Sequence, residues 1–142
     1  MQKDLEQLDV IVGVWNSEGE ITQKDGAPSK IKGTDTYEWL PGKQYMIHWI
    51  NVSMGEQEVH AIEIIGGLDE TKKAFAMNSF QNDAGHSVMW ASKKDERAWL
   101  FAGSEMRAIL TLPGDDEQSM SATWERREGS EWIHWMDIRF SR

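Results

Sequence analysis

The stretch VIVGVWNSEGEI, residues 10–21, joins an apolar run to a Gly-x-Trp tripeptide and then to alternating polar positions. Just before the tripeptide, the segment DLEQLDVIV, residues 4–12, places Leu5, Leu8 and Val12 at the spacing of one helical face. The polar alternation after the tripeptide has instead the period of a strand. We therefore predict one short helix over residues 4–12, which ends where the first strand opens.

Short segments of alternating or apolar character follow this stretch, and turn-forming residues separate them. Examples of the separators are KDGAPS (24–29), NDAGH (82–86) and PGDDEQ (113–118). About ten strands at such close and regular spacing are typical of an antiparallel barrel or sandwich. The chain has 142 residues and no linker-like segment. We therefore expect a mainly β protein with a single domain over residues 1–142. Its expected architecture is an antiparallel up-and-down β-barrel of about ten strands, with the N-terminal helix covering one end.

The charge and composition exclude several classes of partner. The sequence has 24 acidic and 15 basic residues, a formal net charge of −9. Nucleic acids and anionic membranes are bound through basic surfaces, so neither is expected as a partner. Cysteine is absent, which excludes disulfides and thiolate metal sites. The N-terminal segment has charges where a signal peptide needs an apolar core, and no segment approaches the roughly 20 apolar residues of a membrane span. We expect a soluble, cytoplasmic protein.

Alternation along the strands gathers aromatic and charged residues on the predicted inner face of the barrel. This holds for SKIKGTDTYEWL (29–40), SMSATWERR (119–127) and EWIHWMDIRF (131–140). By contrast, QYMIHWINV (44–52) is largely apolar on both faces, which leaves its orientation open. The expected ligand-contacting residues are Asp35, Tyr37, Trp39, Trp90, Trp124, Arg126, Trp132, His134 and Met136.

The predicted order of elements resembles that of the calycin superfamily. A short helix comes first, Gly13-Val14-Trp15 opens the first strand, and only strands follow. That group includes the lipocalins, the fatty-acid-binding proteins and the nitrobindin-like haem barrels. The chain is more similar still to an uncharacterised bacterial family of small calycin-like barrels. Members of that family typically carry a G-x-x-x-x-x-x-L-x-G turn, which here spans residues 33–42, and a G-x-D-x-x-x-K turn, which here spans residues 67–73.

The resemblance implies a structural plug and argues against a fatty-acid site. In lipocalins, the tryptophan of the Gly-x-Trp motif closes one end of the barrel and packs against an arginine of the last strand. The matching residues here are Gly13, Trp15 and Arg139, and a cation–π contact gives the pair a physical basis. Fatty-acid-binding proteins hold the ligand carboxylate with an Arg-x-Tyr pair. Here that pair reads Arg139-Phe140-Ser141, so the tyrosine is missing.

Our first hypothesis for function is a barrel that binds a small apolar or aromatic molecule, without a cofactor. Asp35, Arg126 and His134 would supply polar contacts to the ligand, because buried charges need partners. The alternative for Asp35 and Arg126 is a place at the barrel rim, in contact with water. For His134, the alternative is a core histidine hydrogen-bonded to a neighbour.

Two other hypotheses stay open. One is a haem barrel, similar to nitrobindin, in which His134 is the axial ligand. The other is a structural or interaction protein with a solid core, in which exposed aromatics such as Trp99 or Trp135 form a surface patch or a homodimer contact. We predict no catalytic or metal-binding residue, because the sequence has no Gly-x-Ser-x-Gly elbow and no His-x-x-x-His spacing. An enzyme that uses Asp35 or His134 as acid or base is a further alternative.

Overall fold

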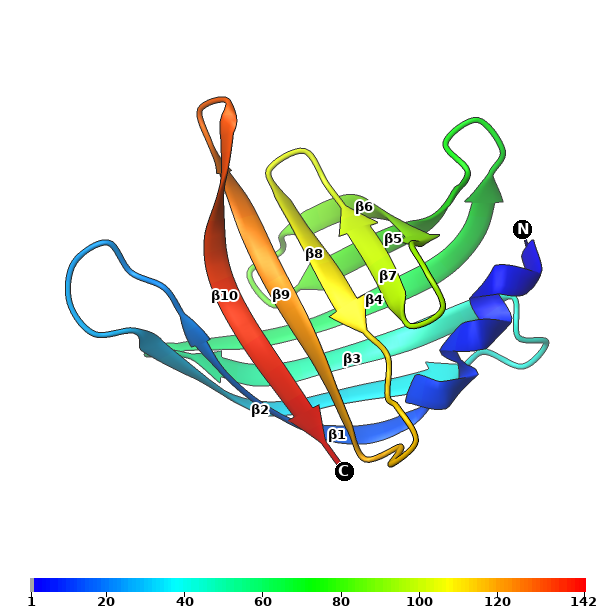
Figure 1. Ribbon diagram of the computed structural model, residues 1–142, viewed down its shortest axis with the longest axis horizontal. Coiled ribbons are helices and arrows are strands. Elements are labelled where there is room, and N and C mark those ends of the chain that lie inside the picture. Colours follow the sequence, from blue (N-terminus) through cyan, green and yellow to red (C-terminus); the bar gives the residue numbers. More distant parts are fainter. Residues whose placement is uncertain (1) are drawn as a thin grey trace.

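The computed structural model describes residues 2–142 as a 3₁₀-helix, η1 (Gln2–Ile11), followed by ten strands. The strands are β1 (Gly13–Ile21), β2 (Ser29–Trp39), β3 (Tyr45–Met54), β4 (Gln57–Asp69), β5 (Ala74–Gln81), β6 (His86–Lys93), β7 (Ala98–Ala102), β8 (Met106–Thr111), β9 (Ser119–Glu128) and β10 (Glu131–Ser141). Neighbouring strands follow chain order and are antiparallel, and β1 also pairs with β10 (Figure 1). The sheet is therefore a closed up-and-down barrel, which confirms the predicted fold class.

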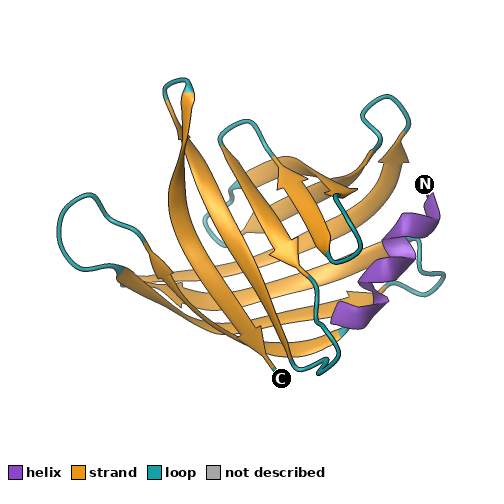
Figure 2. Cartoon of the chain, in the orientation of Figure 1, coloured by secondary structure: helices purple, strands orange, loops and turns teal. Residues whose placement is uncertain are grey.

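Helix η1 lies at one end of the barrel (Figure 2). Leu5, Leu8 and Ile11 recur every three residues, which is one turn of a 3₁₀-helix, so all three fall on one face and are buried. Val12 was predicted as part of this apolar face, but it follows the end of the helix and is only half-buried. The predicted period of 3.6 residues was wrong because the helix is wound more tightly.

The Gly-x-Trp tripeptide connects the helix to β1. Gly13 has a φ of +134°, a conformation that residues with a Cβ rarely adopt. Two residues later Trp15 is fully buried, and its indole Nε1 donates a hydrogen bond to the carbonyl oxygen of Ile11 at 2.8 Å. The guanidinium of Arg142 lies 4.1 Å from the centre of the indole ring. Arg142 also donates hydrogen bonds to two backbone carbonyls near the end of η1. Arg142 thus ties the segment after β10 to the helix and to Trp15.

The arginine that covers Trp15 is therefore Arg142 and not Arg139, as the resemblance implied. In β10 the buried Phe140 faces inward, so its neighbour Arg139 faces outward and is exposed. Arg139 pairs across the sheet with Glu18 of β1. Arg142 can reach the indole because it follows the last strand residue and is free of the strand alternation.

The space between η1 and the barrel is filled. Trp15, Trp99, Met46 and Ile65 are almost completely buried there, in one core cluster with the apolar face of η1. The indole Nε1 of Trp99 donates a hydrogen bond to the Oε1 atom of Gln7 in the helix, at 2.8 Å. Trp99 is therefore a core residue beneath the helix, and the exposed surface role considered for it was wrong.

A β-bulge in β10 reverses the alternation that the sequence suggested. The register against β9 shifts between His134 and Met136, so Trp135 is an extra residue. Before the shift, His134 pairs with Glu125, whose side chain faces outward. After the shift, Met136 pairs with Trp124, whose side chain faces inward. One residue thus changes the face of every position that precedes it in the strand.

Trp132 and His134 consequently face outward, and their predicted place in the interior was wrong. The guanidinium of Arg107 lies 4.3 Å from the centre of the Trp132 ring. The side chain of His134 is 46% exposed, with Nδ1 3.0 Å from the hydroxyl of Thr22 and Nε2 2.8 Å from a carboxylate oxygen of Asp137. His134 therefore does not present its ring to the interior, where an axial haem ligand was expected.

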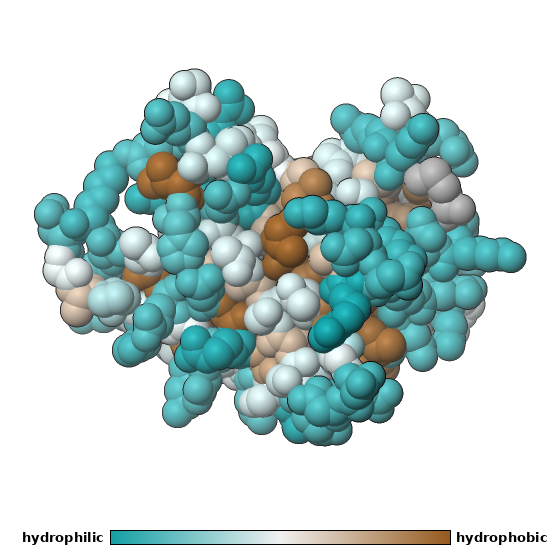
Figure 3. Space-filling view, viewed as in Figure 1, coloured by the Kyte–Doolittle hydropathy of each residue, from teal (hydrophilic) through white to brown (hydrophobic). Residues whose placement is uncertain are grey.

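One face of the outer surface is mainly polar. On the face shown in Figure 3, hydrophilic residues dominate, and the apolar residues lie in small separate groups. Within residues 2–142, no helix is long and apolar enough to cross a membrane. The apolar side chains of the strands are mostly on the inner face, which directs the search for a site to the barrel interior.

Candidate functional site

The barrel encloses a cavity of about 210 Å³, and all ten strands contribute to its lining. Most of the lining side chains are apolar. Five of them are methionines, whose unbranched side chains adapt to ligands of different shape: Met54, Met77, Met89, Met106 and Met136. An engineered apolar cavity of about 150 Å³ binds benzene. Drug-sized ligands occupy pockets of about 300–1,000 Å³. The cavity therefore suits a molecule of one or two rings.

A chain of four buried polar side chains crosses one wall of the cavity, from β1 to β4. The hydroxyl of Ser17 donates a hydrogen bond to Oδ2 of Asp35. The other oxygen of Asp35, Oδ1, is 2.7 Å from Nε2 of His48. On the far side of the ring, Nδ1 of His48 is 3.0 Å from Oε1 of Glu63. Each residue is at most 9% exposed. An imidazolium, which carries a hydrogen on both nitrogens, satisfies both carboxylates at once.

The two carboxylates hold His48 in its charged form. Burial disfavours the imidazolium, but the hydrogen bonds to Asp35 and Glu63, together with their negative charges, outweigh that cost and raise the pKa of His48 to about 9. At neutral pH His48 is therefore protonated and cannot accept a proton as a general base. The group of Asp35, His48 and Glu63 then carries two negative charges and one positive charge.

Tyr37 covers the imidazolium from the side of the plug. Its ring is stacked on the His48 ring, with 4.0 Å between the centroids and 13° between the planes. Burial, followed by the charges of Asp35 and Glu63, raises the pKa of Tyr37 well above its ordinary value. The phenol thus stays neutral and adds no further negative charge. Tyr37 and Trp15 place aromatic rings between the polar chain and the helix.

The cavity leads away from the helix toward the other end of the barrel. There Trp124 and Trp135 meet edge to face, with centroids 6.3 Å apart and an angle of 87° between the planes. Both indoles line the cavity and are half-buried, as is Met54. Trp135 is therefore part of the lining and not the exposed patch that the sequence suggested. Aromatic and thioether groups therefore line this end of the cavity.

The structure brings four of the nine predicted ligand-contacting residues together at the cavity. These are Asp35, Tyr37, Trp124 and Met136. Asp35 and Tyr37 belong to the polar wall, whereas Trp124 and Met136 belong to the apolar part of the lining, on β9 and β10. The alternative for Asp35, a place at the barrel rim in contact with water, does not hold. Its carboxylate is buried and forms hydrogen bonds with Ser17 and His48.

The other predicted residues lie elsewhere. Trp39 packs near the helix and donates its indole hydrogen to Oδ1 of Asp9, at 2.8 Å. Trp90 faces outward between the inward-facing Met89 and Ala91, and the amine of Lys72 lies 5.0 Å from the centre of its ring. The side chain of Arg126 is 41% exposed near the end of β9. Together with the outward Trp132 and His134, these residues do not line the cavity.

Sequence reasoning missed Ser17, His48 and Glu63. Ser17 could have been found, because it shares the inner face of β1 with Trp15, two residues earlier. His48 and Glu63 carry no such signal, since β3 and β4 have apolar side chains on both faces. In the part of the chain that the structure describes, no three His, Asp or Glu side chains are arranged to hold a metal ion.

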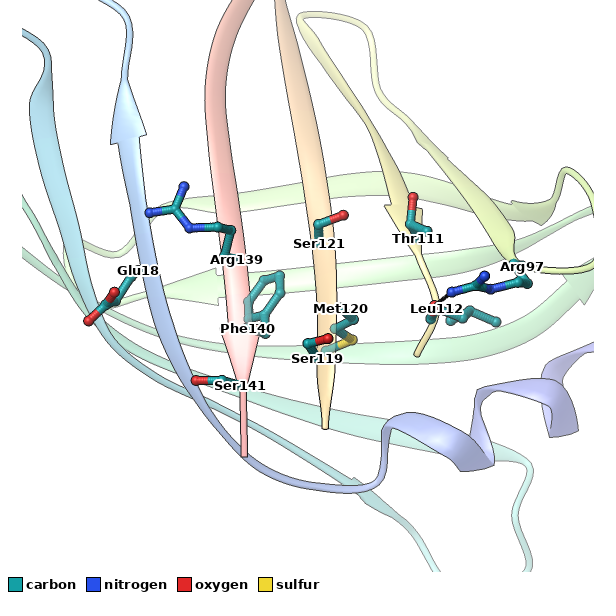
Figure 4. Close-up of a pocket in the computed structure, with 10 residues that line it drawn as sticks. All are labelled: Glu18, Arg97, Thr111, Leu112, Ser119, Met120, Ser121, Arg139, Phe140 and Ser141. Atoms are coloured by element: carbon teal, nitrogen blue, oxygen red, sulfur yellow. Dashed lines mark hydrogen bonds between the residues drawn. The ribbon is translucent and has the colours of Figure 1, made fainter. Parts of the chain in front are cut away.

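A second hollow, of about 510 Å³, lies on the outer surface (Figure 4). Its polar side chains include a row that crosses four neighbouring strands: Thr111, Ser121, Arg139 and Glu18. All four residues are exposed, so water competes for their hydrogen bonds and screens their charges. We regard the smaller interior cavity as the candidate site because its charged groups are buried and organised.

Comparison with known proteins supports the fold. No family model and no curated protein matches the sequence. Among solved structures, the chain is similar to a redesigned β-barrel, mFAP0, bound to DFHBI. The TM-score is 0.51 and the sequence identity is 8%, over 94% of this chain and 99% of that chain. At this level of sequence identity, the structural similarity supports the assignment of a β-barrel fold and nothing more.

Proposed function

We propose that this protein binds a small molecule with an apolar or aromatic body inside the barrel. The observation that carries the proposal is the cavity of about 210 Å³, apolar on most of its surface and crossed on one wall by buried charges. Burying Asp35, His48 and Glu63 costs free energy that a purely structural core avoids by using apolar residues. A few placed polar groups in an apolar cavity are the usual arrangement of a ligand site.

Two further observations support the proposal. The likeness to mFAP0, a barrel bound to DFHBI, offers a precedent for a ligand in a barrel. The Gly13-Val14-Trp15 opening and the helix-covered end also fit the calycin-like resemblance, and we include membership of that group in the proposal. The apolar body of the ligand would contact Trp124 and Met136, where each Å² of buried apolar surface contributes about 25 cal/mol.

Calorimetric titration with tryptophol, a neutral alcohol with two fused rings, tests this function. We expect saturable binding of one molecule per chain. Ala122→Phe places a ring in the cavity and should abolish binding, because Ala122 lines it. Thr123→Phe introduces the same ring on the exposed face of the same strand and should leave binding intact.

Ala122→Phe is expected to cost about 1–3 kcal/mol of stability through overpacking, so its fold is checked by circular dichroism. Ser79→Leu is a second cavity-filling variant with a smaller added volume, and it should weaken binding as well. Binding that both cavity-filling variants retain would contradict the proposal, as would the absence of binding both by tryptophol and by probes with the same ring system and other end groups.

A further inference from the structure

The charges that line the cavity do not balance. Asp35, His48 and Glu63 are its charged residues, and no lysine or arginine in residues 2–142 lines it. With His48 protonated, the carboxylates exceed the cation by one. A surplus charge is costly in an environment of low dielectric constant unless a counter-charge is close by. The cavity therefore lacks one positive charge, which a ligand can supply.

One carboxylate oxygen is available to such a ligand. Ser17 and His48 occupy both oxygens of Asp35, and His48 also occupies Oε1 of Glu63. The remaining oxygen, Oε2 of Glu63, accepts no hydrogen bond from any side chain in the described chain. Ser79 lies directly opposite Glu63 in the pairing of β4 with β5, and both residues line the cavity. The two residues are thus neighbours on the inner wall, and each has a side-chain oxygen that can accept a hydrogen bond.

We propose that the cavity selects a protonated amine carried on a small apolar or aromatic body, with the ammonium group held by Glu63 and Ser79. The proposal rests on the function proposed above and specifies the class of ligand. An ammonium group has three donors and one positive charge, so it satisfies the free acceptors and balances the cavity. The body then extends toward Trp124 and Trp135, whose rings offer apolar contact surface.

The same arrangement rejects anionic ligands. A carboxylate placed at the polar wall would face Asp35 and Glu63 with His48 already shared between them. Its desolvation would be uncompensated, because the lining offers no other cation. The net charge of this site is therefore opposite in sign to that of a site that holds a fatty-acid carboxylate.

Three probes with the same ring system and different end groups test the inference by calorimetry at neutral pH. They are tryptamine, which carries an ammonium group, tryptophol, which carries a neutral hydroxyl, and indolepropionate, which carries a carboxylate. We expect tryptamine to bind about ten-fold more tightly than tryptophol, as one charge-assisted hydrogen bond allows. Indolepropionate should bind at least about ten-fold more weakly than tryptophol.

Glu63→Gln keeps the shape of the side chain and removes its charge. In this variant, the affinity for tryptamine should fall to within about two-fold of that for tryptophol, while tryptophol binding stays nearly unchanged. Glu58→Gln is the matched control, because Glu58 is an exposed residue of the same strand. It should retain the full preference for tryptamine.

If Glu63→Gln does not fold, Ser79→Ala is measured in its place. This variant removes the second acceptor and leaves the contacts of His48 unchanged, and it should reduce the affinity for tryptamine about three-fold. Equal binding of tryptamine and tryptophol to the unmodified protein would overturn the inference, as would tighter binding of indolepropionate. In both cases tryptophol binding would still uphold the proposed function. Failure of all three probes to bind would instead remove the proposed function itself.

Discussion

The helix-covered end of the barrel and the cavity beyond it are built from the same strands but are filled differently. At the helix, Trp15 and Trp99 pack against the leucines of η1 and are completely buried. Along β1, Trp15 is followed on the same face by Ser17, where the polar chain to Asp35 begins. Apolar packing at one end closes the barrel, and the organised charges beyond it leave space. The packed plug and the cavity are thus successive layers of one interior.

The largest expected effect is at the plug. Trp15→Ala removes a buried ring and its hydrogen bond to Ile11, and it leaves Arg142 without its stacking partner. We expect a loss of about 3–5 kcal/mol in the free energy of unfolding, measured by urea denaturation. Trp132→Ala removes the same side chain from the outer surface and should cost about 1 kcal/mol or less. Equal losses in the two variants would contradict the division into layers.

The polar chain should make stability depend on pH. The pKa of His48 is raised from 6.5 to about 9, so its contribution is fully present below about pH 6.5 and is lost as the pH rises through about 9. At about 1.4 kcal/mol per pKa unit, the loss is on the order of 3 kcal/mol. Urea denaturation between about pH 6 and pH 10 should show it, and His48→Gln should remove it.

The exposed His134 provides the control for that measurement. His134→Gln should still show the loss of stability as the pH rises through about 9, because His134 lies on the outer surface and is not part of the polar chain. A profile for the unmodified protein that stays flat through pH 9, or one that His48→Gln does not alter, would show that the carboxylates do not hold the imidazolium in its charged form.

A smaller effect distinguishes the two arginines near the C-terminus. Arg142→Met removes the cation–π contact with Trp15 and the hydrogen bonds to the end of η1, so we expect a loss of about 1–2 kcal/mol in the free energy of unfolding. Arg139→Met changes an exposed residue and should stay within about 0.5 kcal/mol of the unmodified protein. The reverse order of effects would restore Arg139 as the partner of the plug.

The sequence predicted the barrel because turn residues and alternation recur along the whole chain. The same alternation located Asp35 and Tyr37, since β2 pairs without a bulge. It failed at His134, because one extra residue in β10 reverses the faces and leaves no sign in the composition. Alternation made no prediction for His48 and Glu63, because β3 and β4 have apolar residues on both faces and the inner face cannot be identified from the sequence. The polar chain is therefore a product of register, which a single sequence does not reveal.

The pairing of β1 with β10 also limits how copies of this chain can associate. Each strand described in residues 2–142 has hydrogen-bonded neighbours on both sides, so the closed sheet has no edge strand with one whole side free to pair with another molecule. A homodimer, left open by the sequence, would have to use outward side chains such as the adjacent Trp49, Ile62 and Phe80. Aggregation through strand exchange would first require the seam between the first and last strands to open. That seam joins the first and last strands, which no turn connects.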